Sequence, residues 1–232
     1  MSQVCAPVRL LVSVRDAAEA RVALRAGADL IDAKDPERGA LGALPPETVR
    51  GIVATIDGRA ITSAVAGDGT GADLAGAVRA MSEAGPGWIK IAVDDASDAA
   101  LADAAAAAPG RLIGVVFAED SFSNDLPARL AAAGFSGAMI DTRGKRGTGL
   151  RDCLPAATLA AFVASCRAHD LMSGLAGSLR LADIPALAAL GPDYLGFRGG
   201  LCRGGDRRQG LDEARISEAV AALRMPRRAD AA

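Results

Sequence analysis

The hydrophobic and polar positions of this chain alternate between two kinds of segment along almost its whole length. Short apolar runs rich in Val and Ile are typical of buried strands. Each is followed by a longer, alanine-rich stretch whose apolar residues recur with the spacing of an amphipathic helix. We expect strands over residues 8–14, 30–34, 60–66, 88–93, 112–118, 137–141, 171–175 and 194–198.

Helices are expected over residues 16–27, 46–56, 72–83, 96–108, 125–133, 154–169, 179–190 and 213–223. Eight strands in strict alternation with eight helices predict a parallel sheet that is covered by helices. In a chain of 232 residues this count favours a single α/β domain with a closed (β/α)8 TIM barrel over an open doubly wound sheet. We place the barrel in residues 1–226 and a frayed tail in residues 227–232.

Composition and charge exclude several classes of function. The net charge is −2 and the chain has one Trp, one Tyr and five Phe, which argues against nucleic-acid binding. Its four cysteines form no CxxC pair and it has one histidine, so we expect no metal site and reduced thiols. The sequence has neither a signal-like N-terminus nor an apolar run of 18 residues, so we expect a cytoplasmic protein without membrane contact.

The positions of the lysines point to a particular chemistry. The chain has 23 arginines but three lysines, Lys34, Lys90 and Lys145. Lys90 lies inside an apolar strand, where an ammonium without a partner is costly, and Lys34 closes another strand. A lysine can lose its proton and become a nucleophile or a base, whereas an arginine cannot. This distribution favours amine chemistry.

Barrel geometry predicts that these residues converge. Active sites of (β/α)8 barrels lie at the C-terminal ends of the strands, and alternate strands share layers of inward side chains. On the fourth strand, alternation would direct Trp88, Lys90 and Ala92 inward. Ile89, Ile91 and Val93 would then face the helices. The predicted cluster consists of Asp32, Lys34, Lys90, Asp141 and Arg198, joined by Lys145 from the loop after the sixth strand.

Such a cluster suits imine chemistry. Desolvation and neighbouring cations lower the pKa of a lysine, and the neutral amine can then attack a carbonyl. A carboxylate can move protons during the later steps. The alternative is that Asp32 and Lys34 form a structural ion pair, but three lysines, all at strand ends or in the loop just beyond, favour catalysis.

Two loops predict phosphate binding. The usual phosphate site of this fold lies in the loops after strands 7 and 8, where small residues leave backbone N–H groups open to an anion. The alternative is that the glycines only form tight turns. The candidate phosphate ligands are Ser173, Gly174, Gly177 and Ser178 from the first loop, and Arg198, Gly199 and Gly200 from the second.

One further motif is weaker. Residues 67–72 fit the dinucleotide pattern G-x-G-x-x-A, with Asp94 about twenty residues later. Two complete strand–helix units precede this motif, so a barrel loop is the better interpretation. A non-enzymatic nucleotide-binding module would depend on this segment and would leave Lys34 dispensable.

Several segments resemble one enzyme family. The segment Asp32-Ala-Lys-Asp-Pro36 is the most specific, and the resemblance continues at Lys90, in Asp141–Lys145, and in the two loops just described. The chain is similar to (5-formylfuran-3-yl)methyl phosphate synthases, also called 4-(hydroxymethyl)-2-furancarboxaldehyde-phosphate synthases. The resemblance implies a cytoplasmic lyase without a cofactor that condenses two molecules of glyceraldehyde 3-phosphate for methanofuran-type biosynthesis.

The same resemblance implies distinct roles for the lysines. Lys34 would form the Schiff base, Lys90 would accept a proton, and Asp141 and Lys145 would assist proton transfer and phosphate elimination. Candidates for a second phosphate site are Arg198, Arg143 and Arg15. Barrels of this type often assemble, so we expect a homo-oligomer by analogy. A class I aldolase acting on triose or sugar phosphates is the alternative activity.

Overall fold

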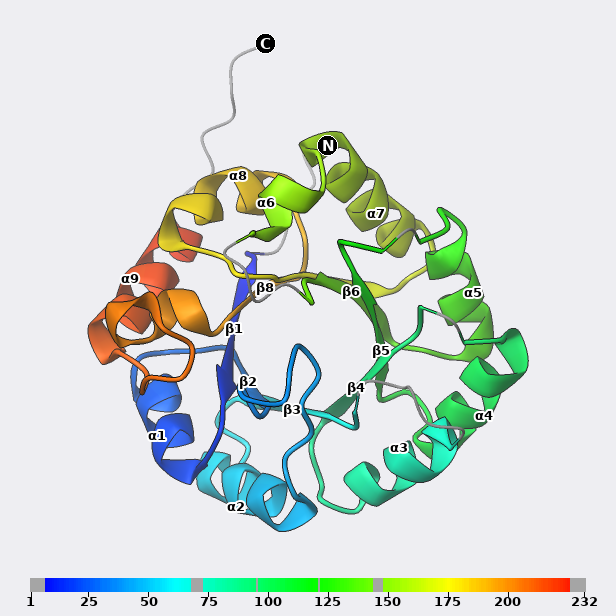
Figure 1. Cartoon of the computed structure of the whole chain (residues 1–232), viewed down its shortest axis with the longest axis horizontal. Coiled ribbons are helices and arrows are strands. Elements are labelled where there is room, and N and C mark those ends of the chain that lie inside the picture. Colours follow the sequence, from blue (N-terminus) through cyan, green and yellow to red (C-terminus); the bar gives the residue numbers. More distant parts are fainter. Residues whose placement is uncertain (1–6, 68–72, 95, 121, 144–147, 226–232) are drawn as a thin grey trace.

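A computed structural model of the chain describes residues 7–67, 73–94, 96–120, 122–143 and 148–225. Its strands form one closed barrel in which parallel neighbours follow the order of the sequence and the eighth pairs with the first. Figure 1 looks along this barrel and shows the helices as a ring outside it. The strands are β1 (Arg9–Val14), β2 (Leu30–Ala33), β3 (Ile61–Val65), β4 (Trp88–Ala92), β5 (Leu112–Phe117), β6 (Gly137–Asp141), β7 (Met172–Leu175) and β8 (Tyr194–Phe197).

The helices of the described residues lie between these strands and after the last one. Asp16, Asp73, Ser97 and Asp212 begin four of them by accepting backbone hydrogen bonds as N-caps. They are α1 (Ala17–Arg25), α2 (Pro46–Ile56), α3 (Leu74–Ser82), α4 (Asp98–Ala107), α5 (Leu126–Ala133), α6 (Leu150–Cys153), α7 (Ala156–Ala168), α8 (Ile184–Ala189) and α9 (Glu213–Arg224), with 3-10 turns η1 (Leu181–Asp183), η2 (Gly199–Leu201) and η3 (Arg203–Gly205).

The predicted barrel is confirmed, with two local differences. The single helix expected over residues 179–190 is divided into η1 and the short helix α8. Pro185 lies in the first turn of α8, where its missing N–H costs no helical hydrogen bond. The sequence pattern also gave no sign of α6, because its four residues are too few to show a helical period.

The strands bury residues on both faces, which gives the molecule two apolar layers. Side chains such as Ile89, Ile91 and Val93 face outward and pack against the helices in the larger cluster. Ala92 and Trp88 belong to a smaller cluster inside the barrel with Leu11, Met139 and Tyr194. The predicted alternation of β4 is therefore confirmed, and it directs Lys90 into the barrel interior.

Gly174 on β7 is required by the packing inside the barrel. The Tyr194 side chain is fully buried, and burial raises the pKa of its hydroxyl. A Cβ atom on Gly174 would lie 2.2 Å from Cζ of this ring. The phenol therefore occupies the space that a side chain at position 174 would need.

Replacing Gly174 by alanine should destabilise the fold. The added methyl group must displace a fully buried aromatic ring, and overpacking of this kind costs about 1–3 kcal/mol or more. Urea unfolding followed by circular dichroism measures the change. Gly51→Ala on the exposed side of α2, where a Cβ would meet nothing within 4 Å, is the matched control. Equal unfolding midpoints for the two variants would contradict this account of Gly174.

Two expectations concern the C-terminal tail and the absence of membrane contact. The tail predicted over residues 227–232 lies outside the described residues. Within the described part of the chain, no helix has both the length and the apolar character needed to cross a membrane.

Candidate active site

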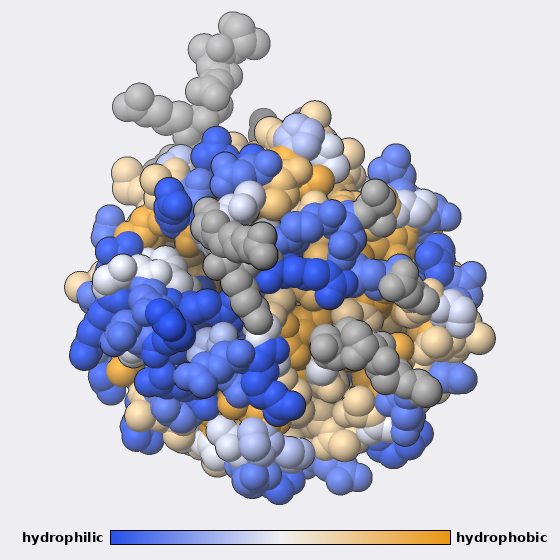
Figure 2. Space-filling view, viewed as in Figure 1, coloured by the Kyte–Doolittle hydropathy of each residue, from blue (hydrophilic) through white to orange (hydrophobic). Residues whose placement is uncertain are grey.

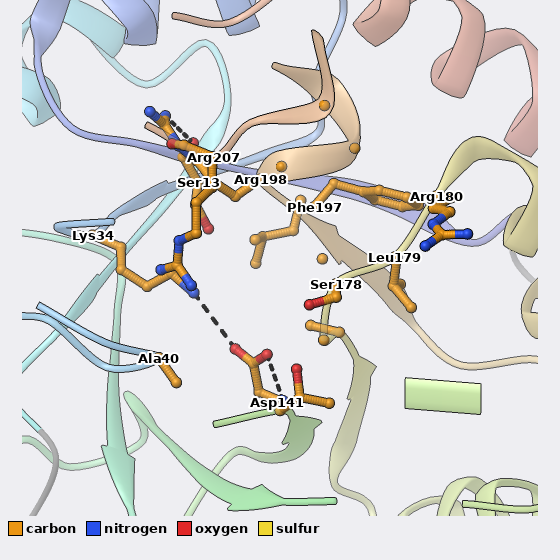
Figure 3. Close-up of a pocket in the computed structure, with 18 of the residues that line it drawn as sticks. Ser13, Lys34, Ala40, Asp141, Ser178, Leu179, Arg180, Phe197, Arg198 and Arg207 are labelled. Carbon is orange, nitrogen blue, oxygen red and sulfur yellow. Dashed lines mark hydrogen bonds and ion pairs between the residues drawn. The ribbon is translucent and has the colours of Figure 1, made fainter. Parts of the chain in front are cut away.

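A cavity of about 450 Å³ opens among the C-terminal ends of the strands. Lys34, Lys90 and Asp141 reach it from the even strands, as the barrel geometry predicts. Figure 3 shows Lys34 and Asp141 facing each other across part of it, with Ser178 and Leu179 on the opposite side from Lys34. A concave polar site at this end of a (β/α)8 barrel is the usual place for catalysis.

The deepest polar group of the site is the carboxylate of Asp32, which is fully buried on β2. Lys90 Nζ lies 2.7 Å from its Oδ2 atom. Ser13 Oγ donates a hydrogen bond to Oδ2 at 3.0 Å, and Ser63 Oγ donates one to Oδ1 at 2.7 Å. Both carboxylate oxygens thus have partners, which is what a buried charge requires.

Burial and charge act in opposite directions on this pair. Burial would raise the pKa of Asp32, but the ammonium groups of Lys90 and Lys34, with hydrogen bonds from Lys90 and Ser63, lower it overall. Burial lowers the pKa of Lys90, and the Lys34 charge adds to this, although Asp32 and Asp141 oppose it. Lys90 therefore gives up its proton more easily than an ordinary lysine, as a general base must.

Lys34 occupies a more accessible position at the end of β2. Its Nζ atom lies 3.5 Å from Oδ2 of Asp141, and the Thr142 N–H donates to the other oxygen, Oδ1, at 2.7 Å. Lys34 is 8% exposed, whereas Lys90 is 1% exposed. A substrate in the cavity can reach Lys34 without the rearrangement that access to a deeper amine would require. Lys34 thus pairs with Asp141 and not with Asp32, the partner considered from the sequence.

Five of the predicted phosphate residues line the cavity: Gly177, Ser178, Arg198, Gly199 and Gly200. The loops after β7 and β8 contact each other closely, since a Cβ on Gly200 would lie 2.3 Å from the Leu179 carbonyl oxygen. Gly177 has a φ of +112° and lies against Thr142, where a Cβ would be 2.5 Å from the threonine methyl group. Glycine at these positions lets the two loops meet beside Asp141.

Ser173 and Gly174 do not join this group. Both lie on β7 and outside the described cavity lining. The Ser173 hydroxyl and N–H both donate to the carboxylate of Asp193, which directly precedes β8 and so lies at the opposite end of the barrel. The small size of Gly174 is thus explained by the Tyr194 ring beside it, and the Ser173 hydroxyl is engaged by Asp193.

Arg198 lines the cavity, but its guanidinium group is engaged by the protein. Its Nη atoms pair with both carboxylate oxygens of Glu19, which is 6% exposed. The Nε atom donates to the Arg207 carbonyl oxygen, and the Nη atoms also donate to those of Ser13 and Gln209. These contacts engage every N–H group of the side chain, so a substrate phosphate would have to displace one of these partners.

The two other arginine candidates are also paired away from the cavity. Arg143 contacts Asp94 and Asp120 and stacks on the Phe117 ring, with Cζ 3.9 Å from the ring centroid. Arg15 contacts Glu19 and donates to the Arg208 carbonyl oxygen. Neither is among the described residues that line the cavity. Lys145 lies outside the described residues, so its predicted place near the site is not described.

Sequence reasoning missed the two serines and the glutamate that organise this site. Ser13 and Ser63 occupy the positions directly beside Asp32 on β1 and β3. A serine beside an inward carboxylate on a neighbouring strand can be recognised as its hydrogen-bond partner. This recognition requires that the pairing and register of the strands are known. Glu19 lies on α1 and gives no comparable signal, because its partner is 179 residues away in the sequence.

The closed barrel and the lysine-containing cavity at the ends of its strands define a (β/α)8-barrel enzyme. Solved structures share this fold: phosphoribosyl anthranilate isomerase from Thermus thermophilus has a TM-score of 0.68 at 15% identity and covers 93% of this chain and 98% of that one. A 3-hexulose-6-phosphate synthase has a TM-score of 0.63 at 19% identity, with 93% and 99% covered. At these identities the likeness shows the fold.

Sequence comparison gives the family. The 4-HFC-P synthase family profile matches residues 10–220, and the chain belongs to this family. It is 34% identical over 235 residues to (5-formylfuran-3-yl)methyl phosphate synthase from Methanocaldococcus jannaschii, covering 90% of this chain and 97% of that protein. A Methylorubrum extorquens protein, provisionally given the same name, is 70% identical over 224 residues, with 97% and 95% covered. The predicted family is confirmed.

Proposed function

We propose that this chain condenses two molecules of glyceraldehyde 3-phosphate into (5-formylfuran-3-yl)methyl phosphate, for a methanofuran-type cofactor. Inorganic phosphate and two molecules of water leave in the process, so the activity is that of a lyase. Membership of the 4-HFC-P synthase family supports this reaction. The observation that carries the chemistry is the pair of lysine–carboxylate contacts, Lys34–Asp141 and Lys90–Asp32, whose two lysines line one cavity.

Lys34 serves as the nucleophile in this proposal. One glyceraldehyde 3-phosphate first isomerises to its ketone form. The Lys34 amine attacks the carbonyl carbon of this ketone, and loss of water gives an imine. Asp141 lies 3.5 Å from Nζ and can take up and return the protons of this step. The imine carbon becomes an electron sink, which makes a neighbouring C–H bond acidic.

Lys90 then acts as the base that removes this proton. Burial lowers the pKa of Lys90, which increases the share of the neutral amine at a given pH. The resulting enamine attacks the aldehyde carbon of the second triose phosphate and forms the new C–C bond. Loss of phosphate and water, ring closure and cleavage of the C–N bond to Lys34 yield the furan and the free amine, with Lys145 as the predicted assisting cation.

The loops after β7 and β8 are suited to hold a phosphate group of the substrates. Gly177, Ser178, Gly199 and Gly200 line the cavity, and the small residues let an anion approach the backbone closely. A phosphate bound there would orient the carbonyl of its triose toward the amine. Such positioning is a major source of rate enhancement.

The reaction itself is tested by supplying glyceraldehyde 3-phosphate to the purified enzyme. A furan aldehyde absorbs in the near ultraviolet, so product formation is followed by absorbance while released inorganic phosphate is measured in parallel. We expect both signals to rise together, one phosphate per furan. An aldolase would instead form a sugar phosphate, without ultraviolet absorbance and without phosphate release, and that result would overturn the proposal.

A further inference from the structure

We infer that Arg207, in the loop after β8, binds a phosphate group of the substrate. The inference rests on the proposed function, because it assigns a ligand to the same cavity. Two triose phosphates bring two anionic groups into this space, and the arginines suggested by the sequence are paired elsewhere. Arg207 lines the cavity and carries the planar guanidinium group that matches phosphate.

The backbone around Arg207 is fixed in place by two other arginines. Arg198 Nε donates to the Arg207 carbonyl oxygen at 3.0 Å, and Arg15 Nη1 donates to that of Arg208 at 3.0 Å. The Arg198 guanidinium is itself held by the buried Glu19. The loop that presents Arg207 is therefore attached to α1 and β8 and not free to drift, which lowers the entropic cost of binding.

The side chain of Arg207 bridges two walls of the cavity. Its Nη2 atom donates to the Gly39 carbonyl oxygen in the loop after β2, at 3.0 Å. Its Cβ atom lies beside Gly199, where a built Cβ would be 3.6 Å from it. Arg207 thus stands between the loop that follows Lys34 and the glycines after β8. In Figure 3 it enters the cavity from the side of Lys34, away from Ser178.

The Nε atom of Arg207 is the observation that points to a ligand. It is buried, and it has no hydrogen-bond partner among the described residues. A buried, unsatisfied N–H on a charged group is costly, and a phosphate oxygen would satisfy it. The neighbouring Asp206 does not neutralise the guanidinium, because its carboxylate accepts hydrogen bonds from Arg208.

The surrounding charge also suits an anion. Among the described residues, three other arginines line the cavity. Arg198 is paired with Glu19, and Arg215 donates to the Gly200 carbonyl oxygen. Arg180 is exposed and lies beside Leu179, across the cavity from Lys34 (Figure 3). Figure 2 shows hydrophilic residues gathered over the loop after β8 and α1, beside the opening of the barrel. Arg207 therefore offers an unsatisfied donor and a positive charge at the edge of the cavity where Lys34 lies.

Binding of glycerol 3-phosphate, an unreactive triose-phosphate analogue, tests the inference by isothermal titration calorimetry. We expect Arg207→Gln to weaken this binding by about 10- to 100-fold, the range for losing charge-assisted hydrogen bonds, and Arg207→Lys to lose less. The matched control is Arg203→Gln, an exposed arginine of the same loop outside the described cavity lining. It should bind as the wild type does.

Two further measurements separate phosphate binding from a structural role. In the furan assay, Arg207→Gln should raise KM for glyceraldehyde 3-phosphate at least tenfold more than it lowers kcat, with an unchanged unfolding midpoint. Wild-type affinity in Arg207→Gln, or an equal loss in Arg203→Gln, would overturn the inference. Because glycerol 3-phosphate binding needs no turnover, a failed furan assay would count against the proposed function alone.

Discussion

Lys34→Arg is expected to abolish furan formation, with a loss of at least about 10³-fold in kcat. The substitution keeps a positive charge beside Asp141, so the ion pair and its electrostatic effect can persist. Arginine does not lose its proton in proteins, so it cannot attack a carbonyl. The loss would therefore be chemical and not structural. Absorbance of the furan aldehyde and release of inorganic phosphate both measure it.

Borohydride trapping adds a direct test of the covalent step. Reduction in the presence of a triose phosphate should fix an adduct on Lys34 in the wild type, detected by intact mass and peptide mapping. Lys90→Arg is the matched control, because it changes the other cavity lysine and leaves Lys34 in place. It should lose turnover but still trap imine at position 34. An adduct that persisted in Lys34→Arg would disprove the assignment of the nucleophile.

Asp32→Asn is expected to lower the free energy of unfolding by about 3–5 kcal/mol. The introduced amide would keep the shape of the side chain but leave Lys90 buried without a counter-charge, and it would strain the hydrogen bonds from Ser13 and Ser63. Urea unfolding measures the loss. The double variant Asp32→Leu/Lys90→Met removes both charges and should recover much of the stability while remaining inactive. An unchanged midpoint for Asp32→Asn would show that the pair is not important to the fold.

Acidification should remove the contribution of the Asp32–Lys90 ion pair to the stability of the fold. The pKa of Asp32 is lower in the folded protein than its ordinary value of 3.8. Its contribution to stability is therefore fully present above about pH 3.8 and is lost as the pH falls through the folded pKa. The difference in unfolding free energy between wild type and Asp32→Asn should narrow in this acidic range.

Much of the fold was predictable because the strand pattern is regular. Alternation on β4 alone placed Lys90 inside the barrel, and the position of Lys34 at a strand end placed it at the cavity. Both inferences depend on local backbone geometry, which the order of residues determines. The predicted roles of these lysines remain predictions that the experiments above address.

Sequence reasoning was least informative where the partner of a side chain lies far away in the sequence. Arg198 occupies the predicted place, but Glu19 on α1 engages its guanidinium. Ser173 and Gly174 have the small size of phosphate-loop residues, yet Asp193 and Tyr194 account for it. Arg207 was missed for the converse reason, because nothing in the surrounding sequence shows that its loop folds back over the site. Composition shows which residues can bind an anion, but not which are already engaged.

The buried position of the two described lysines also affects how the protein can be handled in the laboratory. The chain carries most of its positive charge on arginine, and Lys34 and Lys90 are 8% and 1% exposed. Amine-reactive dyes and resins usually couple to surface lysines at random and spare the active site. In this protein, coupling to the side chain of Lys34 would occur inside the cavity, so labelling at Lys34, located by peptide mapping, would report on access to that cavity.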